Sequence, residues 1–246
     1  MSPARRPLTR NRAGEPQIGS CKEGIMKLRK EYTCPLELVH DMIRGKWKSV
    51  IMWRLNDGPA SLSQLEKDIE GITQKMLTEH LKELVDCDIV AKKTYDGYPL
   101  KVEYSLTLSK GVPLLEAMRI MRRVGVEAFG ETKRPLEMVR DLIRGKWKSI
   151  ILWRLRKGAY SLSGMEKSIN GITQKMLLEQ VKELVDCGLV DKKTYEGYPL
   201  KVEYSLSVAK GAPLLEAMRI MQRVGIDTFM ENGLEHVIIE FGISTD

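Results

Sequence analysis

The chain has 246 residues, 43% of them hydrophobic, and a formal net charge of +7. This length leaves room for two domains of ordinary size, each with its own core. The sequence lacks the run of roughly 18 apolar residues that a membrane span needs, and its arginine-rich start lacks the apolar segment of a secretory signal, so we expect a cytoplasmic protein.

The chain contains one sequence written twice. Residues 35–130 return as residues 135–230, with 67 of the 96 positions identical. Because solenoid repeats are only roughly 20 to 50 residues long, each copy is predicted to be a whole domain. Two copies of one surface suit a target with two equivalent sites, of which palindromic DNA is the leading example. The expected organisation is a basic arm at 1–33, a first domain at 34–130, a short linker at 131–134, a second domain of the same kind at 135–230 and a C-terminal tail at 231–246.

The net charge is spread unevenly along these segments. Residues 1–33 hold eight Lys and Arg against three Asp and Glu, a net of +5, and residues 34–133 hold fifteen of each sign. Residues 134–230 hold seventeen against eleven, a net of +6. Bulk charge is therefore weak support for a nucleic-acid partner, and what matters is whether basic residues share one face.

The first copy opens with two predicted helices. Leu36, Val39 and Met42 follow helical spacing up to Gly45, and a second helix with Trp47 on its apolar stripe stops at Asp57-Gly58. Trp47 is interpreted as a core residue. The neighbouring Lys46 and Lys48 either approach phosphates or are solvated.

A short helix, a tight glycine turn and a longer helix follow, which is the order of a helix-turn-helix. Ser63 and Glu66 have the spacing of a capping box for the short helix, which ends at Gly71, and Thr73 is a good N-cap for a helix that runs to about Asp86. Groups that can hydrogen-bond base edges or phosphates lie on the outward face of the longer helix, although a polar face alone also fits a solvated surface. The candidate DNA-binding residues there are Thr73, Gln74, Lys75, Thr78 and Lys82, and in the second copy Thr173, Gln174, Lys175, Leu178 and Lys182.

A basic β-hairpin is predicted next. Asp96-Gly97 separates two alternating runs, from Ile89 to Tyr95 and from Lys101 to Leu108, which is a strong turn signal. Its candidate DNA-binding residues are Lys92, Lys93, Tyr98 and Lys101, with Lys192, Lys193, Tyr198 and Lys201 in the second copy. A helix-turn-helix followed by such a hairpin is a winged helix. The predicted fold class is therefore mainly α with small β-hairpins (α+β), in two tandem winged helix-turn-helix domains, and each copy closes with a helix that is apolar on more than one face.

These residues also carry a family resemblance over residues 34–130 and again over 135–230. The motifs are Cys34-Pro35, Gly45-Lys46-Trp47-Lys48, Gly71-Ile72-Thr73-Gln74-Lys75-Met76-Leu77, Leu81-Lys82-Glu83-Leu84, Tyr98-Pro99 and Val102-Glu103-Tyr104-Ser105-Leu106-Thr107. The sequence resembles the HxlR family of winged-helix transcriptional regulators. The resemblance implies a homodimeric, MarR-related prokaryotic DNA-binding protein whose first and last helices dimerise. It also implies that the helix after the glycine turn enters the major groove and that the wing touches the flanking backbone or minor groove.

Family members usually have one domain per chain, whereas this chain has two. The connection from Phe129 to Pro135 is too short for the copies to move independently, so we expect an internal pseudo-dimer of the two copies, with further self-association of chains left open.

No metal, cofactor or catalytic site is expected. The four cysteines show no metal-binding spacing, and His40, His80 and His236 form no catalytic constellation. Cys87 and Cys187 are interpreted as small buried hydrophobic residues. Some family members sense oxidants or electrophiles through a cysteine just before the first helix; Cys34 matches that place and is the candidate redox sensor, whereas the second copy has Arg134.

The sequence therefore predicts a nucleoid-associated transcriptional regulator that binds double-stranded DNA at a near-palindromic operator, with a response to redox state or to a ligand left open. The alternative is a winged-helix module that binds protein without specific DNA binding. DNA retention that is sensitive to salt would distinguish the two.

Overall fold

The structure is a computed structural model, and it describes residues 35–96, 98, 101–130, 138–139, 146–198 and 200–233. The expected N-terminal arm, Cys34, the linker at 131–134 and nearly all of the C-terminal tail lie outside the described residues. Among the helices that are described, none is long and apolar enough to cross a membrane.

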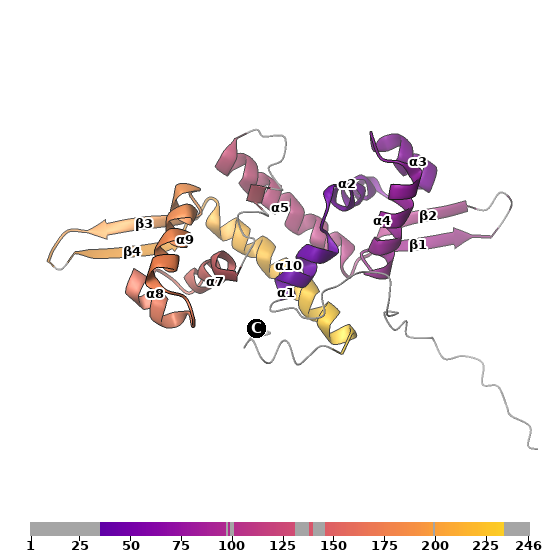
Figure 1. Cartoon of the computed structure of the whole chain (residues 1–246). Coiled ribbons are helices and arrows are strands. Elements are labelled where there is room, and N and C mark those ends of the chain that lie inside the picture. The colour runs from indigo at the N-terminus through magenta and orange to yellow at the C-terminus, as the bar shows by residue number, and fades with distance from the viewer. Residues whose placement is uncertain are drawn as a thin grey trace, which may run out of the picture.

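The first copy has the element order that its sequence pattern predicts, and the second copy has the same order from its second helix onward; the predicted first helix of the second copy lies largely outside the described residues. The α+β fold class with two winged helix-turn-helix domains is confirmed (Figure 1). The elements of the first copy are α1 (Pro35–Met42), α2 (Lys46–Arg54), the short 3-10 helix η1 (Leu55–Asp57), α3 (Leu62–Asp68), α4 (Gln74–Asp86), β1 (Val90–Tyr95), β2 (Lys101–Leu106) and α5 (Gly111–Phe129). Those described in the second copy are α7 (Lys146–Leu155), α8 (Leu162–Ser168), α9 (Gln174–Asp186), β3 (Val190–Tyr195), β4 (Lys201–Leu206) and α10 (Gly211–Glu231).

Side-chain caps set the starts of the helix-turn-helix. Thr73 is the N-cap of α4 as predicted, and its hydroxyl accepts from the Met76 backbone N–H at 3.3 Å. The predicted box of Ser63 and Glu66 is wrong, because α3 already begins at Leu62 and Ser63 lies inside its first turn. Ser61 is the N-cap instead: its backbone is extended, and its hydroxyl accepts from the Gln64 N–H at 3.2 Å.

The core of each copy forms beneath the longer helix of the helix-turn-helix. Leu77, Leu81 and Leu84 recur at helical spacing on α4 and are fully buried, which turns the opposite face of the helix outward. Trp47 is half-buried against this core, in line with its predicted role.

One residue outside the hairpin pairs with strand β2, and the sequence pattern did not predict this pairing. β1 and β2 pair antiparallel from Val90↔Leu106 to Tyr95↔Lys101. Ala60, in the loop before α3, exchanges two backbone hydrogen bonds of 2.9 Å with Tyr104 of β2. This bridge ties the wing to the start of the helix-turn-helix, and Tyr160 and Tyr204 repeat it in the second copy.

The two copies meet through their long helices. α5 packs against α10, and α1 of the first copy also packs against α10. Gly225 lets α1 come close, because a Cβ at this position would lie 2.5 Å from the Pro35 carbonyl oxygen. Lys110, just before α5, forms an ion pair with Glu231 at the end of α10. The long helices thus occupy the middle of the molecule, and the two hairpins lie at its opposite ends (Figure 1).

Candidate nucleic-acid interface

The outward face of α4 gathers the predicted DNA-binding side chains of the helix-turn-helix. Thr73, Gln74, Lys75, Thr78 and Lys82 are all exposed. They lie on the side of the helix that its buried leucines leave free, so they are available together to one partner surface. The second copy repeats the arrangement on α9 with Thr173, Gln174, Lys175, Leu178 and Lys182, all exposed.

The one difference among these predicted helix residues is at position 78 and its copy. The Thr78 hydroxyl donates to the Gln74 carbonyl oxygen at 2.8 Å, so its hydrogen is already engaged within α4. Leu178 is 50% exposed, so it lies on the outward face and not at the boundary with the core.

The lysines of the wing lie on two different faces of the hairpin. Lys92 and Lys93 are consecutive strand residues, and side chains alternate along a strand, so one points to each face. Both are exposed, as are Lys192 and Lys193 in the second copy. The wing therefore presents positive charge on both sides, a suitable arrangement for a hairpin that lies between two phosphate backbones.

Lys101 is partly neutralised within the wing. Its ammonium lies 2.8 Å from a carboxylate oxygen of Glu103, and the Tyr95 hydroxyl donates to the other oxygen at 2.7 Å. The hydrogen bond to Glu103 raises the pKa of Lys101, and the hydrogen bonds from Lys101 and Tyr95 lower the pKa of Glu103. Lys201 and Glu203 repeat the pair at 2.8 Å. These two lysines thus offer less net charge to a phosphate than Lys92 and Lys192, whereas Lys93 and Lys193 lie directly across the hairpin from Glu103 and Glu203 and are also near these carboxylates.

A tyrosine projects from each wing tip. Tyr98 and Tyr198 are fully exposed. A large ring held in solvent has a polar hydroxyl and an apolar face available to a ligand.

Lys48 does not have either of the roles considered from the sequence. Its side chain is 6% exposed, so it is neither solvated nor able to reach a phosphate. Its ammonium donates to the Met42 carbonyl oxygen at 3.0 Å and lies 2.9 Å from a carboxylate oxygen of Glu83 on α4. The overlooked signal was its place on the inward stripe of α2, three positions before Ile51 and seven before Leu55.

The Lys48 contact changes the ionisation of Glu83. Burial raises the pKa of this carboxyl, but the hydrogen bond and the charge of Lys48 lower it, helped by His80, and the net shift is below the ordinary value. The Glu83 carboxylate therefore stays ionised. In the second copy, Lys148 forms the corresponding ion pair with Glu183.

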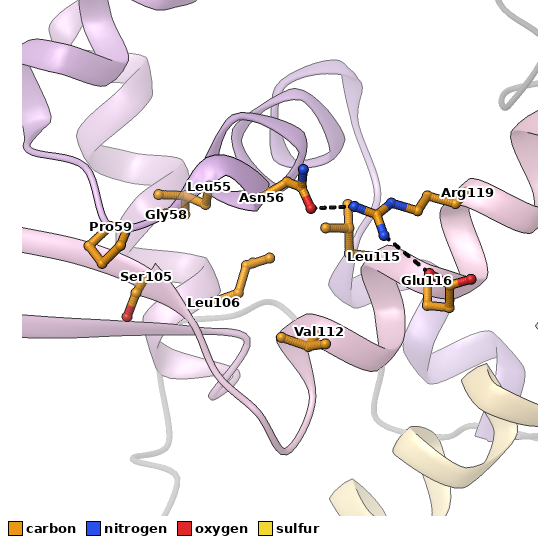
Figure 2. Close-up of a pocket in the computed structure, with 10 residues that line it drawn as sticks. All are labelled: Leu55, Asn56, Gly58, Pro59, Ser105, Leu106, Val112, Leu115, Glu116 and Arg119. Atoms are coloured by element: carbon orange, nitrogen blue, oxygen red, sulfur yellow. Dashed lines mark hydrogen bonds and ion pairs between the residues drawn. The ribbon is translucent and has the colours of Figure 1, made fainter.

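A depression of about 240 Å³ lies apart from the outward face of α4, between η1, β2 and α5 (Figure 2). Leu55, Leu106 and Leu115 give it apolar walls. At its rim, Arg119 donates to the Asn56 side-chain oxygen and lies 3.3 Å from a Glu116 carboxylate oxygen. The depression is lined by residues of the first copy from η1, the loop after it, β2 and α5. None of the predicted DNA-binding residues lines it.

The remaining predicted site residues concern redox and metal chemistry. Cys34 lies outside the described residues, so its role as a redox sensor stays a prediction. Cys87 and Cys187 are half-buried against the core, and burial raises the pKa of the Cys187 thiol, which disfavours the reactive thiolate. In the part of the chain that the structure describes, no group of three or more His, Cys, Asp or Glu side chains is placed to hold a metal ion.

Comparison with known proteins adds an independent view of both copies. The sequence model of the HxlR-like helix-turn-helix family matches residues 42–133 and again residues 142–232. MalR of Fusobacterium mortiferum is 38% identical over 103 residues, which span 42% of this chain and 96% of MalR. YkvN, an HTH-type transcriptional regulator of Bacillus subtilis (strain 168), is 42% identical over 78 residues, 32% of this chain and 66% of YkvN. Among solved structures, the redox regulator HypR in its reduced form aligns with 36% identity and a TM-score of 0.36, covering 38% of this chain and 91% of HypR.

Proposed function

This chain belongs to the HxlR-like helix-turn-helix family of transcriptional regulators, and we propose that it binds double-stranded DNA in a sequence-specific manner as a covalent pseudo-dimer. The observation that carries the proposal is the exposed polar face of α4 beside a basic wing, present twice in one chain. Each copy then reads one half-site of a near-palindromic operator.

The exposed residues divide into two roles. Gln74 and Lys75, with Gln174 and Lys175, open the helices that enter the major groove, where an amide or ammonium group can hydrogen-bond base edges. The wing lysines, with Tyr98 and Tyr198 at the tips, contact the backbone or minor groove beside each half-site. These contacts position the protein and carry little sequence information.

The packing between the copies supports the pseudo-dimer. The helices α5 and α10 pack together, α1 lies on α10, and the ion pair of Lys110 and Glu231 joins the start of one long helix to the end of the other. These contacts are within one chain, so a single chain carries both reading helices.

We also propose that the second copy binds its half-site more tightly. It has Arg156, Lys157 and Asn170 where the first copy has Asn56, Asp57 and Glu70. Asn56 accepts a hydrogen bond from Arg119 of α5, and Arg156 lies 4.4 Å from the Trp153 ring centroid. The greater positive charge of the second copy strengthens its long-range attraction for phosphates, and this effect weakens as salt rises.

The deciding experiment selects bound sequences from a random duplex pool at low salt. We expect an enriched motif with two related half-sites, and an affinity that falls steeply as salt rises because counterions are displaced. Replacing Gln74 and Gln174 with Ala should relax base preference, whereas Gln222→Ala on α10 should not. If no duplex is retained and no motif is enriched, the protein-binding alternative replaces this proposal.

A further inference from the structure

Lys48 is in contact with three helices at once. It belongs to α2, it donates to the carbonyl oxygen of Met42 at the end of α1, and it forms an ion pair with Glu83 on α4. Its side chain is 6% exposed, so the Lys48 ammonium itself is shielded from bulk water, whereas Glu83 is 34% exposed.

The α1 end of this link reaches the other copy. α1 packs on α10, and its first residue, Pro35, lies against the backbone of α10 at Gly225. A continuous path therefore runs from α10 of the second copy through α1 and Lys48 to Glu83 on the helix that presents Gln74 and Lys75. The path begins where α1 contacts α10 and ends at α4, the helix that carries the outward face.

The Lys48 contacts resist sliding in a way that the surrounding apolar contacts do not. Apolar packing is non-directional, whereas a hydrogen bond weakens steeply with angle and distance. If α4 rotated against α1, the buried ammonium would lose Met42 or Glu83, and a buried charge without a partner is strongly unfavourable. Lys48 thus favours one orientation of α4 relative to α1.

We propose that Lys48 is a positioning residue that fixes α4 relative to α10 of the other copy, and so sets the half-site spacing that the chain accepts. This inference rests on the proposed DNA binding. It assigns to a buried lysine, distant from the outward face, a part in operator selection.

The second copy has the ion-pair half of this link in a more exposed place. Lys148 is 13% exposed and its partner Glu183 is 52% exposed, against 34% for Glu83. His80, whose Nδ1 lies 3.5 Å from a Glu83 carboxylate oxygen, is replaced by Gln180. The ion pair of the second copy is therefore more strongly screened by water.

The test uses the full chain and the two half-sites obtained by selection, placed at the preferred spacing or with one base pair added. For each variant the measured quantity is the ratio of affinities for the two duplexes. Lys48→Met, which removes both polar contacts while keeping an unbranched apolar side chain, should reduce this ratio by about tenfold, within the usual range of coupling between sites. Glu83→Gln, which removes only the charge at the α4 end, should reduce it by less.

Two controls separate positioning from a general structural effect. Lys46→Met removes the same charge from an exposed neighbour on α2 and should leave the ratio unchanged. A duplex with only one half-site should bind the wild type and Lys48→Met with affinities within about twofold of each other, because the reading face is intact. A variant that merely destabilised the fold would lower all affinities together and leave the ratio as it was.

The outcomes are distinct. A folded Lys48→Met chain with the wild-type ratio overturns the inference; if that variant fails to fold, the same ratio measured for Glu83→Gln decides. A wild-type chain that binds no selected duplex overturns the proposed function instead.

Discussion

Position 78 and its copy differ in chemistry on otherwise matching outward faces. Thr78 has bonded its hydroxyl hydrogen to the Gln74 carbonyl, whereas Leu178 holds half of its surface in solvent. A single exposed leucine is common on protein surfaces, so its exposure alone does not assign a role. Its place between Gln174 and Lys182 on the proposed reading face makes base contact testable.

Exchanging the two residues, as Thr78→Leu with Leu178→Thr, should move a base preference from one half-site to the other. The expected change is about 1 kcal/mol, or about fivefold in affinity, for one apolar or hydrogen-bond contact. The measurement compares the affinities of the wild-type and exchanged chains for the selected operator and for a duplex in which the two half-sites have changed places. A perfectly palindromic motif that is indifferent to the exchange would show that this position does not read bases.

The Lys48–Glu83 ion pair should make stability depend on pH. The pKa of Glu83 is lowered in the folded chain, so the unfolded chain binds its proton first as pH falls. The stabilisation is therefore complete above the ordinary glutamate value of 4.5 and is lost as pH falls through the lower folded value. Urea unfolding should show wild type more stable than Glu83→Gln at pH 7, with the gap shrinking below about pH 4.5. A gap that stays constant down to acid unfolding would contradict this account.

For single residues, the sequence predicted local roles such as helix capping better than it predicted contacts between distant residues. Thr73 could be predicted as a cap because the signal is local, but Ser61 and Ser63 offered two similar cap positions and only the helix start distinguished them. The role of Lys48 depends on Glu83, 35 positions away in the chain, and no local pattern pairs them.

At the level of secondary-structure elements, each wing has lysines on both of its faces, but only one face also carries a glutamate. Lys92 and Lys93 point to opposite faces, and Lys93 shares its face with Glu103, its cross-strand partner, which forms an ion pair with Lys101. If the wing lies between two phosphate backbones, Lys92 contributes fully and Lys101, which is in direct contact with the carboxylate, contributes least.

Replacing Lys92 and Lys192 with Ala, or Lys93 and Lys193 with Ala, should weaken binding to all sequences alike and leave the selected motif unchanged. Each pair should reduce the slope of log affinity against log salt by roughly 0.9 for every phosphate that the variant no longer neutralises. Replacing Lys101 and Lys201 with Ala provides the comparison and should reduce the slope less. Equal reductions for all three pairs would mean that Glu103 and Glu203 do not screen their partners.

The close approach of α1 to α10 depends on Gly225. Alanine in a helix interior is favoured over glycine by about 1 kcal/mol. A Cβ here would nevertheless lie 2.5 Å from the Pro35 carbonyl oxygen and 2.8 Å from the Pro35 Cβ, so α1 would have to move. Overpacking of this kind costs about 1 to 3 kcal/mol, which outweighs the gain.

Gly225→Ala should therefore lower the free energy of unfolding and increase amide exchange in α1, measured by urea unfolding and by hydrogen exchange. Gly164→Ala is the matched control, because its Cβ would meet only the Ser161 hydroxyl at 3.1 Å and the Tyr160 ring at 3.8 Å, and the first copy has Gln64 at this place. A Gly225→Ala chain as stable as wild type would show that α1 is not held closely.

The elements themselves follow from local patterns, which is why the helices and the hairpin were predicted with nearly correct limits. The packing of α1 on α10 was not predicted, because the sequence pattern of a helix shows which of its faces is apolar but not which distant helix covers that face. The Ala60 bridge was missed for a related reason: a single paired residue has no alternation to detect.

For the whole molecule, we expect one chain to occupy one operator, with half-sites about 34 Å apart. Native mass spectrometry of the complex, or sedimentation with labelled duplex, measures the stoichiometry. The comparison is a duplex with one half-site, which should also bind one chain but less tightly. A complex in which two chains each contribute one reading helix would contradict the pseudo-dimer.

The contact of α5 with α10 inside one chain has a consequence for dosage. A regulator assembled from two separate subunits falls apart on dilution, so its occupancy of an operator rises with the square of subunit concentration when the protein is scarce. If this chain binds DNA as proposed, the second reading helix is always present, since the chain itself holds it at a fixed effective concentration. For a regulator of this design, occupancy rises in direct proportion to the number of chains, and a cell with only a few copies keeps a graded response without an assembly threshold.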